Sequence, residues 1–130
     1  MLIDDFFSIL ELKQTQKSEE GTYILDVTIK INSQHRIFQG HFPDMPVVPG
    51  VCLIEIIREI LEKHFKKQLF IKGLKNTKFT SIVNPLVNDL LNVSYELTEL
   101  EDKSLNVKSK IFYKDTIFLK FDGLFSTQYE

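Results

Sequence analysis

The sequence has no tryptophan, one cysteine, four prolines and five glycines among its 130 residues. A single cysteine excludes an internal disulfide and a zinc site built from several thiolates, and it is typical of a protein kept in a reducing compartment. No apolar run approaches the roughly 18 residues that a membrane-spanning helix needs. Residues 1–10 carry two aspartates where a secretory signal has basic residues. We therefore expect a cytoplasmic protein with no membrane span and no signal peptide.

The chain also lacks a strong excess of charge of either sign. Sixteen Lys and Arg against eighteen Asp and Glu give a net charge of −2, which argues against nucleic acid as a partner. Hydrophobic residues make up 43% of the chain and include eleven phenylalanines. This is enough to build a core without disulfides or structural metal ions. A chain of this length is typical of one domain. We therefore expect a single domain over residues 1–130.

The few prolines are concentrated in one place, because three of the four fall within residues 39–59, together with two of the five glycines. Proline fixes φ and glycine permits backbone geometry that other residues avoid, so this segment has one imposed shape. His41 lies near its start, and Glu55 lies inside the apolar run that begins at Val51. A histidine on a stiff turn and an acid within an apolar helix indicate a two-residue acid–base site.

Alternation of apolar and polar residues predicts most of the remaining chain to be β-strand. Residues 2–8 predict either a short helix or a segment that packs Phe6 and Phe7 on a neighbour. A helix is expected over about residues 49–66, with Pro49 in its first position, buried through Ile57 and emerging into solvent from Arg58. The strands are expected from residue 10, over residues 22–31, within 69–82, and around 91–97, 105–113 and 117–123. This order predicts an α+β fold: an antiparallel sheet curled around one long helix, with about four strands in a meander after the helix.

The proline-rich segment resembles the active-site signature of the beta-hydroxyacyl-ACP dehydratases of bacterial fatty acid synthesis. The matching residues are His41-Phe42-Pro43, Pro46-Val47-Val48-Pro49-Gly50-Val51 and Glu55, set against the family pattern H-F-P-x-x-P-V-x-P-G-V-L-x-x-E. The two ionisable positions, 41 and 55, lie 14 residues apart as in the family. The glutamate resembles the dehydratase type rather than the bifunctional dehydratase/isomerase, which has aspartate there. The resemblance implies the hot-dog fold, a sheet wrapped around a central helix.

The chain departs from this pattern at two places. Asp44 stands where the family usually has glycine, and Ile56-Ile57-Arg58-Glu59 replaces the family's Ala-x-Ala-Gln after the acid. The second departure puts a second carboxyl group, that of Glu59, one helical turn beyond Glu55.

The resemblance implies a role for each residue of the motif. His41 is expected to be the base, since a neutral imidazole has its pKa near the working pH. Glu55 is expected to be the acid and to keep its proton through burial, and the like charge of Glu59 one turn further on is expected to favour protonation of one of the two carboxyls. The amide of Gly50, at the helix N-terminus, is expected to bind the thioester carbonyl oxygen with help from the amide of Val51.

Phe42, between the base and the proline turn, is assigned to the substrate-binding residues with Gly50 and Val51. No cofactor is expected, and the three histidines are not spaced as a metal site. His35 and His64 lie among polar residues and are expected to be solvated.

Two other interpretations of the helix remain open. Glu55 can instead pair with Arg58, three residues on, as a structural ion pair. Cys52 near the helix N-terminus can have a lowered pKa and act as a nucleophile, although its apolar neighbours favour core packing.

Three functions follow from these expectations. The first is a (3R)-hydroxyacyl-ACP dehydratase that forms trans-2-enoyl-ACP in fatty acid or related polyene or polyketide synthesis. The alternatives are a hot-dog acyl thioesterase and a non-catalytic acyl-binding accessory subunit.

The expected partner is acyl carrier protein carrying a 3-hydroxyacyl-phosphopantetheine. Carrier proteins are acidic, so we expect a basic patch at the tunnel mouth, with candidates Arg36, Lys63, Lys66, Lys67, Lys75 and Lys78. The working unit is expected to be a homodimer, or a trimer of such dimers. Each active site would then take its histidine and its acid from different subunits.

Overall fold

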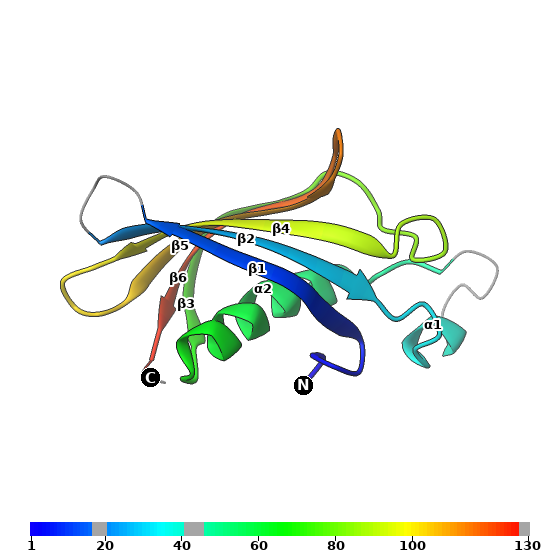
Figure 1. Cartoon of the computed structure of the whole chain (residues 1–130), viewed down its shortest axis with the longest axis horizontal. Helices are drawn as coiled ribbons and strands as arrows, with labels where there is room; N and C mark the ends of the chain where they lie inside the picture. The colour runs from blue at the N-terminus through cyan, green and yellow to red at the C-terminus, as the bar shows by residue number, and fades with distance from the viewer. Residues whose placement is uncertain (17–20, 41–45, 128–130) are drawn as a thin grey trace.

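The computed structural model describes residues 1–16, 21–40 and 46–127 (Figure 1). The predicted base His41 and its neighbour Phe42 lie outside the described residues. The elements, in chain order, are β1 (Phe7–Gln16), β2 (Thr22–Ile31), α1 (Ile37–Gly40), α2 (Gly50–Phe65), β3 (Phe70–Phe79), β4 (Leu90–Glu99), β5 (Leu105–Tyr113) and β6 (Thr116–Ser126).

The strands form one antiparallel sheet in the order β1-β2-β4-β5-β6-β3, and α2 lies along one face of it (Figure 1). This confirms the predicted architecture of a sheet around one long helix. The predicted meander is right for β4, β5 and β6 but wrong for β3, which pairs with β6 at the far edge. Residues 80–89 carry the chain from that edge back to β4, beside β2, and strand patterns alone do not specify such a crossing.

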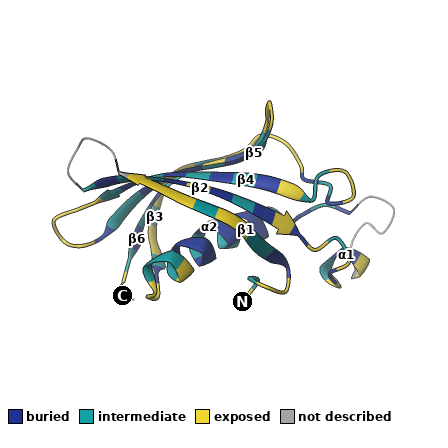
Figure 2. Cartoon of the chain, in the orientation of Figure 1, coloured by how far each residue is buried: buried dark blue, intermediate teal, exposed yellow. Residues whose placement is uncertain are grey.

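The predicted alternation is confirmed in the central strands, where every second side chain enters the core (Figure 2). The buried residues of β2 and β4 are Leu25, Val27, Ile29, Ile31, Leu91, Val93, Tyr95 and Leu97. The edge strand β1 differs, because its register against β2 shifts between Ile9 and Glu11. Leu10, where the sequence predicts this strand to begin, lies at the bulge and is exposed.

Helix α2 begins at Gly50 with Pro49 as its N-cap, so Pro49 is not the first helical residue as predicted. It ends at Phe65, and the C-cap residue Lys66 has a left-handed backbone (φ 57°). The amides of Lys66 and Lys67 both donate to the Glu62 carbonyl. The predicted emergence into solvent from Arg58 is wrong for Glu59, which is buried with Ile60 and Leu61, and right for Lys63, Lys66 and Lys67, which are exposed. The N-terminal segment folds back over the side of α2 that carries Glu59.

Isoleucines and leucines on α2 fill the space beneath the sheet, and each fully buried side chain contributes about 1.5–3 kcal/mol relative to exposure. The hydroxyl of Tyr95 in β4 donates to the Ile57 carbonyl at 3.0 Å, a buried polar link between sheet and helix. No described helix combines the length and the apolar character needed to cross a bilayer.

The N-terminal segment, residues 1–6, forms no helix. It makes a turn at Asp4 (φ 65°) and then enters β1. Phe6 is fully buried against the rings of His35 and Phe38, at centroid distances of 5.2 and 5.6 Å. The amide of Asn32 donates to the Phe6 carbonyl at 2.8 Å. Of the two sequence interpretations of this segment, packing of its phenylalanines is confirmed.

Candidate active site

The first turn of α2 carries two of the residues expected to bind substrate. The amide of Cys52 already donates to the Pro49 carbonyl at 2.9 Å, whereas helix geometry leaves the amides of Gly50 and Val51 without an intrahelical acceptor. The ring of Phe79, at the end of β3, lies against Gly50, where a Cβ atom would come within 2.9 Å of two ring carbons. Glycine therefore permits this close approach, and the backbone donors lie next to an exposed aromatic ring.

Glu55 lies one turn further along α2 and is clamped by Arg58. The guanidinium Nε donates to Oε1 at 2.9 Å and Nη2 to Oε2 at 2.5 Å. This hydrogen bonding holds the pKa of Glu55 below its ordinary value and outweighs partial burial. The expectation that burial keeps a proton on Glu55 is therefore wrong for the isolated subunit. The alternative pairing with Arg58 is confirmed.

Arg58 is itself fixed by two further acceptors. Its Nη1 donates to the Leu69 carbonyl at 3.1 Å and lies 2.7 Å from Oε2 of Glu62. The same Glu62 oxygen accepts the Leu69 amide at 2.8 Å. The guanidinium thus bridges α2 and the chain entering β3, which gives the Glu55 carboxylate a defined place.

Glu59 is the buried acid of the helix, with a side chain that has no exposed surface. Its Oε1 accepts the amides of Leu2 and Ile3, both at 2.9 Å, and Glu55 lies one helical turn before it on α2. Loss of hydration on burial raises the pKa of Glu59, and the neighbouring Glu55 carboxylate adds to the increase. The sequence predicts Glu59 as a like charge beside Glu55 and as the first alternative acid, but not as a buried group. Its burial depends on the N-terminal segment, which no local pattern places there.

The remaining ionisable candidates are structural. Burial raises the pKa of the Cys52 thiol, which disfavours the nucleophile interpretation. His35 is buried rather than solvated: its Nδ1 accepts the Ile37 amide at 3.1 Å and its Nε2 contacts Asp5 at 3.0 Å. His64 is half-buried and contacts Gln14, and desolvation lowers its pKa. Over the described ranges, no three His, Cys, Asp or Glu side chains come together as a metal site.

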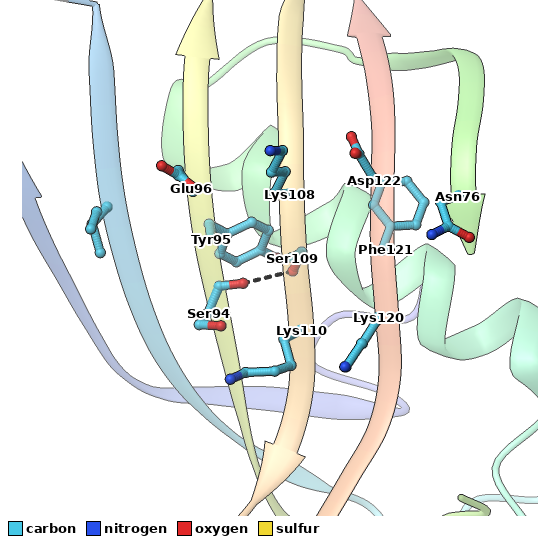
Figure 3. A pocket seen from close by; sticks show the side chains of 11 residues that line it. Asn76, Ser94, Tyr95, Glu96, Lys108, Ser109, Lys110, Lys120, Phe121 and Asp122 are labelled. Atoms are coloured by element: carbon cyan, nitrogen blue, oxygen red, sulfur yellow. Dashed lines mark hydrogen bonds between the residues drawn. The ribbon is translucent and has the colours of Figure 1, made fainter. Parts of the chain in front are cut away.

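The outer face of the sheet, opposite α2, has a hollow of about 510 Å³ over β4, β5 and β6. Figure 3 shows Lys110 and Lys120 on neighbouring strands at one end of it, with Glu96, Lys108 and Asp122 aligned across the other. The strand register places Lys78 opposite Lys120, and Lys120 opposite Lys110. Three lysines thus form one row across β3, β6 and β5, which we call the lysine row.

Comparison with known proteins identifies this architecture. The family model described as "ApeI-like: ApeI dehydratase" matches residues 14–115, and these include the proline-rich segment and the whole of α2. The chain belongs to the ApeI-like dehydratase family. It is therefore a dehydratase, a hydro-lyase, as the sequence predicts.

Curated relatives and solved structures agree with this assignment. The 3-hydroxyacyl-[acyl-carrier-protein] dehydratase FabZ of Lactiplantibacillus plantarum is 30% identical over 105 residues, covering 75% of this chain and 69% of the relative. An uncharacterized protein from Erwinia carotovora subsp. atroseptica superposes with a TM-score of 0.72 at 18% identity, covering 94% of this chain and 97% of that one.

A second solved structure, the dehydratase heterocomplex ApeI:P from Xenorhabdus doucetiae, superposes with a TM-score of 0.57 at 14% identity, covering 90% of this chain and 95% of that one. At such identities the two structures establish the fold alone. The predicted hot-dog fold is thereby confirmed.

Proposed function

We propose that this ApeI-like protein is a (3R)-hydroxyacyl-ACP dehydratase that works with His41 as base and Glu55 as acid. The observation that supports the assignment best is the arrangement on α2. Within the family-matched region, Glu55 follows the unpaired amides of Gly50 and Val51 by one helical turn, at the family's spacing from His41. Its substrate would be a 3-hydroxyacyl group carried by the phosphopantetheine of acyl carrier protein, in fatty acid or related polyene or polyketide synthesis.

The reaction divides between these residues as follows. His41 removes a proton from C2, and the electrons of that C–H bond form the C2–C3 double bond. The hydroxyl leaves C3 with a proton from Glu55, as water. The amides of Gly50 and Val51 and the positive end of the helix dipole stabilise the negative charge that develops on the thioester oxygen. Phe42, next to the base, completes the proposed substrate site.

The reverse reaction is the direct test of this function. The purified protein is expected to hydrate a crotonyl thioester to the 3-hydroxybutyryl product without releasing free thiol. The loss of the enoyl absorbance measures the rate of this hydration. Release of thiol at a comparable rate would instead indicate the thioesterase. A folded protein that binds acyl-ACP but turns over neither substrate would indicate the accessory subunit, and either result would overturn the proposal.

The proposed working unit is a homodimer, or a trimer of such dimers. Strand β3 is an edge strand, and unpaired edges favour pairing with a second copy. Large apolar side chains are exposed from the α2 N-terminus along β3 and the loop that follows: Val51, Leu74, Phe79, Ile82, Leu86 and Val87. Exposed apolar surface of this extent is typical of an interface.

We place the docking surface for the acidic carrier protein at the lysine row. Helix α2 has 16 residues and is about 24 Å long. The candidates Lys66 and Lys67 therefore lie far from Gly50, beyond the opposite end of the helix. Lys78, in contrast, precedes Phe79, whose ring contacts Gly50. The two side chains lie on opposite faces of the edge strand β3, so the row reaches the sheet edge beside the site from the outer face. Like charges directly opposite one another destabilise a sheet, so an acidic partner that neutralises the row would be favoured.

Replacing Lys120, the middle member of the row, tests this docking. Lys120→Glu puts a carboxylate between Lys78 and Lys110, which is expected to stabilise the fold slightly while removing the basic surface. We expect the KM for acyl-ACP to rise about 10-fold, as loss of roughly 1.4 kcal/mol of interaction implies, with little change for a short pantetheine thioester.

Lys67→Glu makes the same charge change at the far end of α2 and is the matched control. Equal effects of the two variants on KM, or an equal effect of Lys120→Glu on both substrates, would exclude a docking role for the row.

We also propose that the enzyme works in the cytoplasm. The single cysteine is buried as a free thiol, as expected in a reducing compartment, and acyl carrier protein would be its partner there.

A further inference from the structure

The carboxyl groups of Glu55 and Glu59 lie one turn apart on the same side of α2, and they differ sharply in surroundings. That of Glu55 is partly exposed and faces a bidentate cation, whereas that of Glu59 is enclosed by protein. The charged groups around the pair are Arg58 and Glu62 on α2 and the α-amino group of Met1 in the N-terminal segment. A single negative charge shared by two neighbouring carboxyls is therefore best placed on Glu55, beside Arg58, and the one proton on the enclosed Glu59.

The contacts of Glu59 are also those that a transient anion needs. The amides of Leu2 and Ile3 converge on Oε1 at 2.9 Å, and the Leu2 amide lies 3.0 Å from Oε2. These donors do not move when the proton leaves, so they would stabilise the Glu59 carboxylate at the moment it forms. The bonds from Asn32 to the Asp5 and Phe6 carbonyls hold the same segment in place.

We propose that Glu59 is a positioning residue that stores the proton which Glu55 delivers to the leaving hydroxyl. The inference rests on the proposed dehydratase function, because it assigns the source of the acid's proton in that reaction. It also explains how a carboxyl clamped by Arg58 can act as an acid at all.

Each step conserves protons and electron pairs. The O–H bond of Glu59 breaks as an O–H bond forms on Glu55, which moves the negative charge from Glu55 to Glu59. Glu55 then transfers the proton to the C3 hydroxyl, the C–O bond breaks and water leaves, while His41 takes the C2 proton. The imidazolium and the two carboxylates that result return to the resting state when His41 releases its proton to solvent, and the partly exposed Glu55 takes up a proton and passes it to Glu59.

Kinetics of Glu59→Gln separate proton storage from simple hydrogen bonding. A glutamine amide can still donate a hydrogen bond and fill the same volume, but it cannot release a proton. We expect kcat for crotonyl thioester hydration to fall at least 10-fold with KM little changed, and the pH profile of kcat to change shape. The control is Asp5→Asn, which weakens the anchoring of the same N-terminal segment by removing the negative charge that faces His35. Its pH profile is expected to keep the wild-type shape.

Thermal stability supplies a second readout that needs no activity. Burial raises the pKa of Glu59 above the ordinary 4.5, so above pH 4.5 the folded protein keeps a proton that the unfolded chain has released. Native stability therefore falls as pH rises through this window. Glu59→Gln cannot lose stability in this way, because glutamine does not titrate. The Tm of the variant minus the Tm of the wild type is therefore expected to increase as pH rises. The lowered pKa of Glu55 acts in the opposite sense and only below 4.5, so it does not produce this trend.

The outcomes are distinguishable. A wild-type kcat and pH profile in Glu59→Gln would overturn the proton store, as would a Tm difference that does not change with pH. If Glu59→Gln does not fold, the carboxyl resonances of wild-type protein labelled with ¹³C-glutamate decide the question, since one must titrate above its ordinary range. If the wild type lacks hydratase activity but shows this titration, the proposed function is wrong, whereas the conclusion that Glu59 holds a proton in the folded protein is supported.

Discussion

Glu55→Gln and His41→Ala are each expected to lower kcat about 10²–10⁴-fold, the range typical of general acid–base groups. The glutamine amide has no proton to give to the leaving hydroxyl, and alanine cannot accept the C2 proton. The fold is expected to survive the loss of Glu55, because Arg58 keeps the Leu69 carbonyl and Glu62 as partners. A partly exposed pair at this helical spacing contributes only about 0.3–0.5 kcal/mol.

Turnover of crotonyl thioester and thermal unfolding should be measured on the same preparations. Both variants should melt within a few degrees of the wild type. Near wild-type turnover by Glu55→Gln would show that another residue is the acid, and Glu59 would be the first to replace next. Full activity of His41→Ala would show that His41 is not the base, whatever the result for Glu55.

Sequence patterns predicted the elements of this fold because each inward-facing set is encoded locally. In β2 and β4, the apolar residues at every second position are the ones buried in the core. The boundaries of α2 were predicted to within one residue by Pro49 and the basic residues after the helix. The place of β3 at the far edge was missed, because sheet order depends on contacts between segments distant in the sequence.

The same distinction separates the predicted and the missed parts of the site. The positions of Glu55 and Gly50 on α2 follow from local spacing. The protonation of Glu55 does not, since it depends on Arg58, which the Leu69 carbonyl holds in place, and on the burial of Glu59 beneath residues 2–3. Two residues absent from the family pattern, Arg58 and Glu59, therefore govern the charge of Glu55, which belongs to the pattern.

Mixing the two inactive variants, His41→Ala and Glu55→Gln, is expected to restore activity if each site takes its histidine and its acid from different subunits. Random exchange makes half of the dimers heterodimers, and each heterodimer has one site with both residues intact. About a quarter of all sites should then be active, so the mixture should regain roughly a quarter of wild-type activity under conditions that exchange subunits.

The interface explains why exchange and activity should change together. Val51 and Phe79, expected to lie at the subunit contact, adjoin the amides of Gly50 and Val51, so a partner covering these side chains would also enclose the site. Recovery should therefore follow the rate of subunit exchange, measured with labelled subunits. A mixture that exchanges fully and stays inactive would show that both residues of a site come from one chain, and a fully active monomer would exclude shared sites altogether.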